Sequence, residues 1–175
     1  MAKRPGILTG TAGVYYVAYQ LAARGFHAAV TYGNAPTVDL LVGLIDGAAT
    51  LSLQVKASSW ALRTRGRGKS KEPHHYEWDV GAKSARLAQP DLFFAFVDLK
   101  SLSGQLPDIF IIPSEVVFEY FLKWKPYFDR TPNARWRYHS KVEEIEQYKN
   151  NWDLLQSHLN QKTEKEVAPT TPNDS

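Results

Sequence analysis

Residues 37–57 read TVDLLVGLIDGAATLSLQVKA, and this stretch decides the expected fold. It holds two apolar runs, 37–42 and 51–57, separated by Asp46-Gly47, a dipeptide typical of a hairpin turn. Apolar runs of this length bounded by turn residues indicate strands that are largely buried. The stretch therefore predicts two adjacent strands within a packed sheet.

Each of these runs carries polar side chains at positions where a buried strand would otherwise be apolar. Asp39 interrupts the first run, and Gln54 and Lys56 interrupt the second. Gln54 and Lys56 are two residues apart, so they lie on the same face of a strand. Pairing of the two strands would bring an acid, an amide and a lysine together, a group that can hold a divalent cation against a phosphate.

The 175-residue composition is that of a globular protein, with 43% hydrophobic, 22% charged and 13% aromatic residues. We expect one domain over residues 1–160 and a disordered polar tail over 161–175. No apolar run approaches the roughly 20 residues of a membrane span, and no secretory signal follows the N-terminus. We expect a soluble, cytoplasmic protein. Cysteine is absent, which excludes disulfides, thiolate nucleophiles and cysteine-rich metal sites, so a metal must be held by oxygen or imidazole.

Positive charge is concentrated in one glycine-rich segment that follows the second strand. The net charge of +3 is small, but this segment alone carries Arg63, Arg65, Arg67, Lys69 and Lys71. We expect a mobile basic loop that binds DNA through its phosphates in a salt-dependent way. The alternative is a solvated loop whose charge serves only solubility.

The remaining chain predicts an α/β protein with a mixed central sheet flanked by helices. The strand bearing Gln54 should run parallel to the strand at 92–97, through a right-handed crossover containing a helix. Residues 125–137 carry two prolines and are expected to form a loop. The other expected strands are 26–31 and 108–112, and the expected helices are 11–24 (capped by Thr11 and stopped by Gly25), 80–88 (capped by Asp79), 114–124 and 142–159.

The order of these expected elements and of their polar residues over 10–121 resembles the PD-(D/E)XK nuclease superfamily, in particular restriction-endonuclease-like and Holliday-junction-resolvase-like members. Val38-Asp39-Leu40 is similar to the family's second-strand motif, and Leu53-Gln54-Val55-Lys56 to its Glu/Gln-x-Lys motif. The resemblance implies an αβββαβ core, here with extra C-terminal helices. It also implies an endonuclease that hydrolyses DNA phosphodiester bonds with Mg²⁺ or Mn²⁺.

The resemblance further implies roles for single residues. Asp39 would be the one charged metal ligand, with the Gln54 side-chain oxygen and the Val55 carbonyl as neutral ligands, while Lys56 would act on the attacking water and the phosphate. The family's first-helix glutamate would fall on Val14, which cannot bind metal. Gln20 is the nearest polar residue on that helix, on another side of it.

Structural alternatives remain open for each candidate. Asp39 can instead cap the turn before its strand, and Lys56 can be an edge-strand charge that opposes aggregation. His74 and His75 indicate either a solvated loop or a metal site. The tyrosines at 15, 16 and 19 can pack in the core or stack on bases.

Two rival functions also remain open. The first is a catalytically impaired nuclease-fold module that binds nucleic acid or partner proteins. The second is a homodimer joined by the aromatic face of the last helix.

Overall fold

The computed structural model describes residues 6–31, 37–45, 47, 49–100 and 103–167. Five strands form a central sheet in the order β1-β2-β3-β6-β7, in which β3 and β6 are parallel and the other pairs antiparallel. Their bounds are β1 Phe26–Val30, β2 Leu40–Leu44, β3 Thr50–Ser58, β6 Leu92–Asp98 and β7 Asp108–Pro113. The mixed α/β architecture with a central sheet flanked by helices is therefore confirmed, as is the parallel pairing of β3 with β6.

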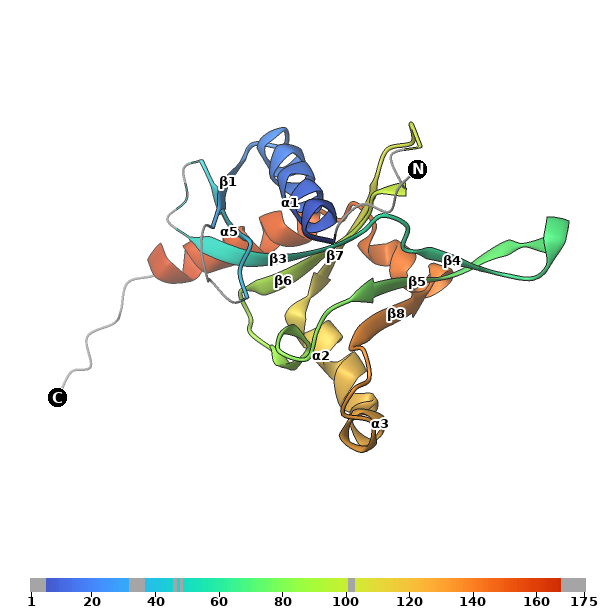
Figure 1. Ribbon diagram of the computed structural model, residues 1–175. Coiled ribbons are helices and arrows are strands. Elements are labelled where there is room, and N and C mark those ends of the chain that lie inside the picture. The colour runs from blue at the N-terminus through green and yellow to red at the C-terminus, as the bar shows by residue number, and fades with distance from the viewer. Residues whose placement is uncertain (1–5, 32–36, 46, 48, 101–102, 168–175) are drawn as a thin grey trace.

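Two helices cover one face of this sheet (Figure 1), namely α1 (Gly6–Ala22) and α5 (Asp153–Val167). Their buried side chains include Val17 and Leu21 of α1 and Leu155 and Leu159 of α5, packed on β2 and β3. Gly13 allows the close approach of α1 to β3, because a Cβ at that position would overlap the Ala57 side chain. Among the described residues, no helix has both the length and the apolarity needed to cross a membrane.

The other face is covered by a helix and a second, three-stranded sheet in the order β4-β5-β8. Trp78 of β5 is buried between the sheets and donates a hydrogen bond to the Val97 carbonyl at 2.9 Å. The bounds are β4 Leu62–Arg65, β5 Glu72–Asp79, β8 Arg137–Lys141, α2 Ser114–Lys123, α3 Lys125–Arg130 and α4 Val142–Ile145, with short 3₁₀ helices at Gly68–Ser70 (η1), Ser84–Arg86 (η2) and Glu146–Tyr148 (η4).

The crossover from β3 to β6 differs from the prediction. It consists of the β4–β5 hairpin followed by the short 3₁₀ helix η2. The helix expected over 80–88, which is also the helix between the third and fourth strands of the αβββαβ core, is therefore absent from this described segment. Asp79 is the last residue of β5 and not a helix cap. The backbone of Val80 and Gly81 is held by the Trp136 carbonyl, and Gly81 has a φ of +79°. The positive φ of Gly81 lies outside the right-handed helical region and interrupts a helix at this point.

The basic segment is also corrected from a mobile loop to a hairpin. Arg63 and Arg65 lie on β4, Arg67 and Lys69 in or beside η1, and Lys71 directly before β5. The hairpin extends away from the body of the protein (Figure 1). Tyr76 and Trp78 face the core from β5, and their burial anchors its base.

The first helix begins earlier than predicted, at Gly6. Thr11 therefore lies inside the helix and does not cap it, and its hydroxyl donates a hydrogen bond to the Ile7 carbonyl. Gly25, with a φ of +83°, ends the turn after the helix as expected.

The predicted loop 125–137 contains the helix α3, because a proline in the first helical turn is tolerated.

The predicted helix 142–159 is broken at Asn150, whose φ is +50° and whose N–H donates to the Ile109 carbonyl. Finally, α5 continues through Val167, so residues 161–167 of the expected disordered tail are helical. Residues 168–175 lie outside the described part, as does Asp46 of the predicted turn.

Candidate functional site

Asp39 lies where β2 begins to pair with β3. Its N–H donates to the Leu53 carbonyl at 2.9 Å, and its Oδ2 accepts a hydrogen bond from the Val55 N–H at 2.7 Å. The Val55 N–H of β3 thus bonds to a side-chain carboxylate, where a longer β2 would have offered a main-chain carbonyl. The two strands separate at this point, and the half-buried carboxylate is held in the opening between them.

Val55 and Gln54 supply two further oxygens at this point on β3. In a β-strand the N–H and C=O of one residue face the same neighbouring strand, so the Val55 carbonyl faces the side on which Asp39 lies. The Gln54 side chain is buried on the opposite face of β3 from Val55, and its Oε1 has no hydrogen-bond partner among the described residues. A buried acceptor without a partner costs about 1–3 kcal/mol, which favours the presence of a further partner at this atom.

Lys56 projects from the same face of β3 as Gln54. Its Nζ donates to Ser84 Oγ at 3.2 Å, and burial lowers its pKa below the ordinary value of a lysine, against the opposing effect of Asp39 and then Asp79. The predicted edge-strand alternative is wrong, because β3 is the middle strand of the five-stranded sheet. A desolvated ammonium group is therefore held within electrostatic reach of the Asp39 carboxylate.

A pocket of about 310 Å³ lies against Asp39, between α1 and the strand ends. Its lining includes Val14 and Tyr15 of α1, together with Thr31, Asp39 and Val55. Val14 thus lies beside the candidate site, where the resemblance would have a glutamate. Gln20 is not among the lining residues and is bonded through its Oε1 to Arg24 at 2.6 Å.

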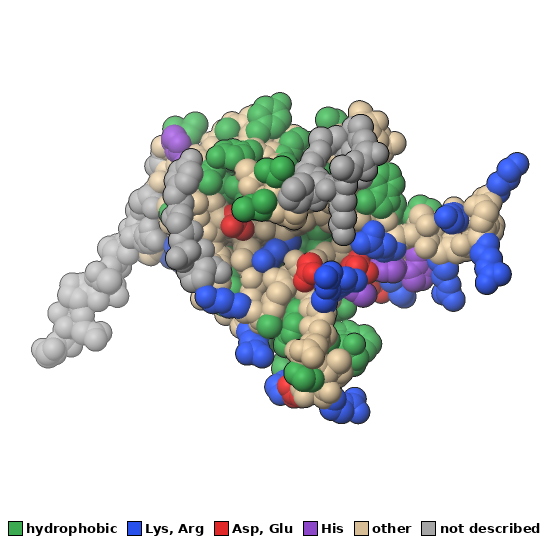
Figure 2. Space-filling model, in the orientation of Figure 1, with side chains coloured by type: hydrophobic (Ala, Val, Ile, Leu, Met, Phe, Trp, Pro, Cys, Tyr) green, Lys and Arg blue, Asp and Glu red, His purple; other side chains and the backbone are tan. Residues whose placement is uncertain are grey.

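The predicted nucleic-acid-binding residues lie apart from this pocket. Figure 2 shows lysine and arginine side chains gathered at the outer part of the β4–β5 hairpin. Arg63 differs from the others, because it is half-buried at the base of the hairpin and forms an ion pair with Glu77 at 3.6 Å. Arg65, Arg67, Lys69 and Lys71 are exposed and are available to a polyanion.

Ser84 and Asp79 are neighbours of Lys56 that the sequence does not predict. Ser84 lies 28 residues beyond Lys56 in the chain and accepts its hydrogen bond, whereas Asp79 acts on Lys56 through its charge. Both lie near Lys56 because β5 and η2 fold back on the second face of the central sheet. No spacing pattern along the chain signals this contact.

No known family model and no curated protein matches this chain. A solved structure does: the bacterial homing endonuclease I-Ssp6803I is similar in fold, with a TM-score of 0.59 over 93% of this chain and 99% of that chain, at 14% sequence identity. At that identity the likeness concerns the fold. The chain accordingly shares the overall fold of that structure. Asp39 and Val55 line the pocket beside α1, whereas Gln54 and Lys56 are not among its lining residues and project from the other face of β3.

Proposed function

We propose that this protein is a divalent-metal-dependent endonuclease of the PD-(D/E)XK type that hydrolyses DNA phosphodiester bonds. The observation that carries the proposal is the Asp39 carboxylate held between β2 and β3 within electrostatic reach of the partly desolvated Lys56 ammonium group. An acid and a lysine fixed at one point of a sheet suit binding of a cation together with a phosphate. The nuclease-like fold supports the same assignment.

The donor set fits Mg²⁺ or Mn²⁺. Asp39 would hold the cation through its carboxylate, with the Val55 carbonyl and the Gln54 Oε1 as neutral oxygen ligands. The fit rests on two observations. The buried Gln54 Oε1 has no hydrogen-bond partner within the described part of the chain, and the Val55 carbonyl faces the side of Asp39. When bound, the cation supplies positive charge that polarises the scissile phosphate and activates a water molecule. With a single carboxylate, affinity for the metal should be low until the DNA phosphate adds its own oxygens.

Lys56 has the charge-stabilising role in this proposal. Its ammonium group is partly desolvated, so its interaction with negative charge building on the phosphate is stronger than in water. Ser84 positions the Nζ, because its hydroxyl accepts the lysine's hydrogen bond. The lowered pKa of Lys56 also brings it closer to neutral pH, which favours proton exchange with the attacking water.

DNA is the proposed substrate, and the β4–β5 hairpin is its proposed contact. The hairpin presents a row of exposed arginine and lysine side chains outside the protein body. Contacts of this kind follow the phosphate backbone and carry no base specificity. The hairpin would therefore position the duplex while Asp39 and Lys56 act on one phosphodiester.

Cleavage of plasmid, single-stranded and branched DNA in Mg²⁺ or Mn²⁺ tests the proposal. Asp39→Asn keeps an acceptor for the Val55 N–H and removes the charge, and Lys56→Met keeps most of the side-chain volume and removes the ammonium group. Each should lower the rate by about 10²–10³-fold, the loss typical of one electrostatic group in an active site. Asp129→Asn and Lys123→Met, which alter exposed residues of α3 and α2, should cleave at the wild-type rate. Equal rates for wild type and Lys56→Met would contradict the enzymatic proposal.

Val14 favours a second candidate, a nuclease-fold module that binds DNA without cutting it. The site pocket has an apolar side chain at this position, which leaves one carboxylate for the metal. Calorimetric titration with an uncleavable DNA separates the two functions. A nuclease should bind DNA more tightly with Mg²⁺, and Asp39→Asn should abolish that gain. DNA affinity that is unaffected by both Mg²⁺ and the substitution would support the binding module.

A further inference from the structure

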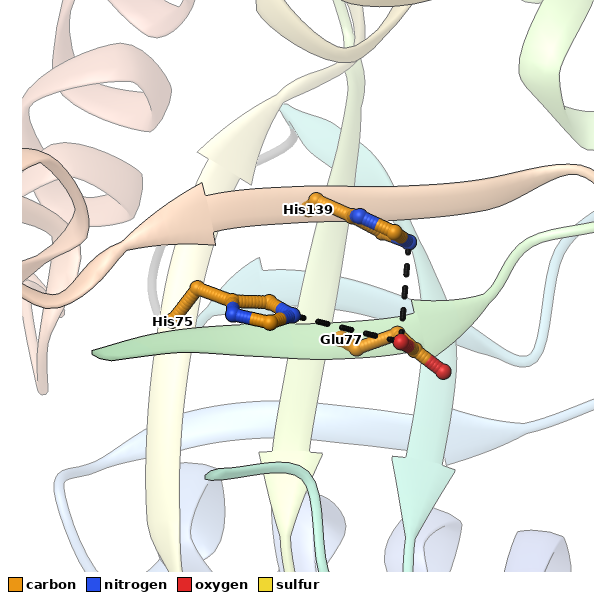
Figure 3. Close-up of side chains that lie close together, drawn as sticks. All are labelled: His75, Glu77 and His139. Carbon is orange, nitrogen blue, oxygen red and sulfur yellow. Dashed lines mark ion pairs between the residues drawn. The ribbon is translucent and has the colours of Figure 1, made fainter. Parts of the chain in front are cut away.

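A second group of metal-binding side chains lies on the outer face of the three-stranded sheet. His75 and Glu77 alternate on β5, the middle strand, and His139 lies directly opposite Glu77 on β8. Figure 3 shows both imidazole rings directed at the Glu77 carboxylate. The Glu77 Oε2 lies 3.7 Å from His139 Nε2 and 4.0 Å from His75 Nε2, and one ligand atom from each residue lies within 4.8 Å of the other two.

The two oxygens of the Glu77 carboxylate have different neighbours. Oε1 accepts a hydrogen bond from Arg137 at 2.7 Å and forms an ion pair with Arg63 at 3.6 Å. Oε2 is the oxygen that faces both histidines. The guanidinium groups therefore orient the carboxylate from one side and leave its second oxygen directed toward the imidazoles.

The surroundings of the two histidine rings favour the neutral form, which binds metal. The Nδ1 of His75 is 2.8 Å from the Nδ1 of His74, so a hydrogen bond there can fix the tautomer and leave Nε2 with a free lone pair. The rings of His75 and His139 stack with their centres 5.4 Å apart. Burial lowers the pKa of both rings, which favours the neutral form that binds metal.

We propose that His75, Glu77 and His139 form a binding site for a divalent transition metal of the zinc class. Two imidazole nitrogens and one carboxylate oxygen are ligands that zinc takes at about 2.0–2.2 Å, and a tetrahedral site then needs about 3.4 Å between ligand atoms. The separations of 3.7 and 4.0 Å from Glu77 to the two histidines, and of at most 4.8 Å between the histidine nitrogens, exceed that spacing by about 0.3, 0.6 and at most 1.4 Å, which side-chain rotation can close. Nearly half of the His139 side chain is exposed, so the cation can enter from solvent.

This site differs in chemistry and in place from the Asp39 site. Asp39, Gln54 and Val55 offer only oxygen, which suits Mg²⁺, whereas imidazole nitrogen selects zinc-like metals. With three protein ligands the zinc keeps one open position for water or an anion. Metal bound here would also join β5 to β8 and so stabilise the sheet that carries the basic hairpin.

Thermal unfolding of metal-free protein with added Zn²⁺ tests the site. Free Zn²⁺ at 100 times its dissociation constant should raise the Tm of the wild type by about 5–10 °C, because only the folded state holds the three ligands together. His139→Gln and His75→Gln should lose most of this rise. His27→Gln, which changes an exposed histidine of β1, and Asp39→Asn should keep it. An equal rise in wild type and His139→Gln would overturn the proposal.

Cobalt(II) titration of the wild type gives a second readout that needs no variant. One equivalent should produce the strong visible absorption bands of four-coordinate Co²⁺, and Zn²⁺ should remove them. Absence of these bands at saturating Co²⁺ would overturn the tetrahedral site. Both experiments leave the proposed DNA cleavage untouched, since neither uses DNA or Mg²⁺.

Discussion

In the proposed function, Val14 limits the negative charge that the Asp39 pocket can offer to a metal. It lines this pocket together with Asp39 and Val55. A carboxylate introduced here would face the same space as the Asp39 side chain. The proposed function therefore makes Val14 the residue at which a single substitution can increase activity.

We predict that Val14→Glu increases the affinity for Mg²⁺ at least about tenfold and speeds DNA cleavage at limiting metal. Two unit charges about 4 Å apart interact by about 1 kcal/mol in bulk water and by about 4 kcal/mol near a protein surface, and a doubly charged cation doubles the interaction. Without metal, repulsion between the new carboxylate and Asp39 should lower the Tm, and Mg²⁺ should restore it. Calorimetry and cleavage rates over a Mg²⁺ series measure these effects.

Gln20→Glu is the matched control, since it adds the same charge to α1 at a residue bonded to Arg24 outside the pocket. It should leave both metal affinity and rate unchanged. An increase of the same size in Gln20→Glu would mean that net charge, and not the position of Val14, sets metal binding.

Single residues of the site were predicted to different extents by the sequence. The two-residue period of a strand correctly predicted that Gln54 and Lys56 share a face, and the polar interruption of the first run made Asp39 a candidate. The hydrogen bond from the Val55 N–H to Asp39 depends on where β2 separates from β3, which no local pattern reveals. Glu77 and His139 come together through pairing between residues 62 apart, so the local motif showed only His74 and His75.

The β4–β5 hairpin is the element to which the proposed function assigns the DNA contact. Its glycine- and arginine-rich end suggested a loop, although the alternation of buried Tyr76 and Trp78 with outward Glu77 is a strand pattern in β5. Burial of Tyr76 and Trp78 favours a strand at the base of the hairpin, and the charged residues then form its solvent-exposed outer part.

We predict that replacing four exposed hairpin residues by glutamine weakens DNA binding and flattens its salt dependence. Each phosphate that the variant no longer neutralises should reduce the slope of log affinity against log salt by about 0.9. Thermal stability should change little, because exposed side chains contribute little to folding. Fluorescence anisotropy over a salt series measures the slope for the variant at Arg65, Arg67, Lys69 and Lys71.

The control neutralises the same number of exposed positive charges elsewhere. It carries glutamine at Lys83, Lys123, Arg130 and Lys165. If this control loses as much DNA affinity as the hairpin variant, the DNA contact is not localised on the hairpin.

The attachment of α5 joins the end of the described chain to the centre of the fold. Asp91, directly before β6, accepts hydrogen bonds from Lys162 at 2.6 Å and pairs with His158 at 2.8 Å, both on α5. The bond from Lys162, and then that from His158, holds the pKa of Asp91 below its ordinary 3.8. The sequence predicted an amphipathic last helix, but not its break at Asn150 or this polar attachment.

The sign of this shift predicts a pH dependence. A lowered folded-state pKa means that Asp91 stabilises the fold above its ordinary pKa, and that this contribution is lost as the pH falls through the lowered value. At pH 7, Asp91→Asn should therefore lower the Tm by at most a few degrees, since the pair is partly exposed. The difference between the two proteins should shrink as the pH falls below about 4.

Melting curves of wild type and Asp91→Asn from pH 7 to pH 2 measure this difference. Asp129→Asn, which removes an exposed pair on α3, serves as the control and should differ little from wild type at any pH. A Tm difference for Asp91→Asn that stays constant through the acid range would show that charge on Asp91 does not attach α5.

Anomalous scattering from Mn²⁺ in crystals of the protein with uncleavable DNA tests the assignment of the Asp39 site most directly. An anomalous peak within ligand distance of the Asp39 carboxylate, the Gln54 side-chain oxygen and the Val55 carbonyl is the predicted result, with the scissile phosphate on its open side. Asp39→Asn crystals should lack this peak while retaining the DNA. DNA bound across the pocket with no Mn²⁺ near Asp39, at a concentration that supports cleavage, would contradict metal-dependent hydrolysis at this site.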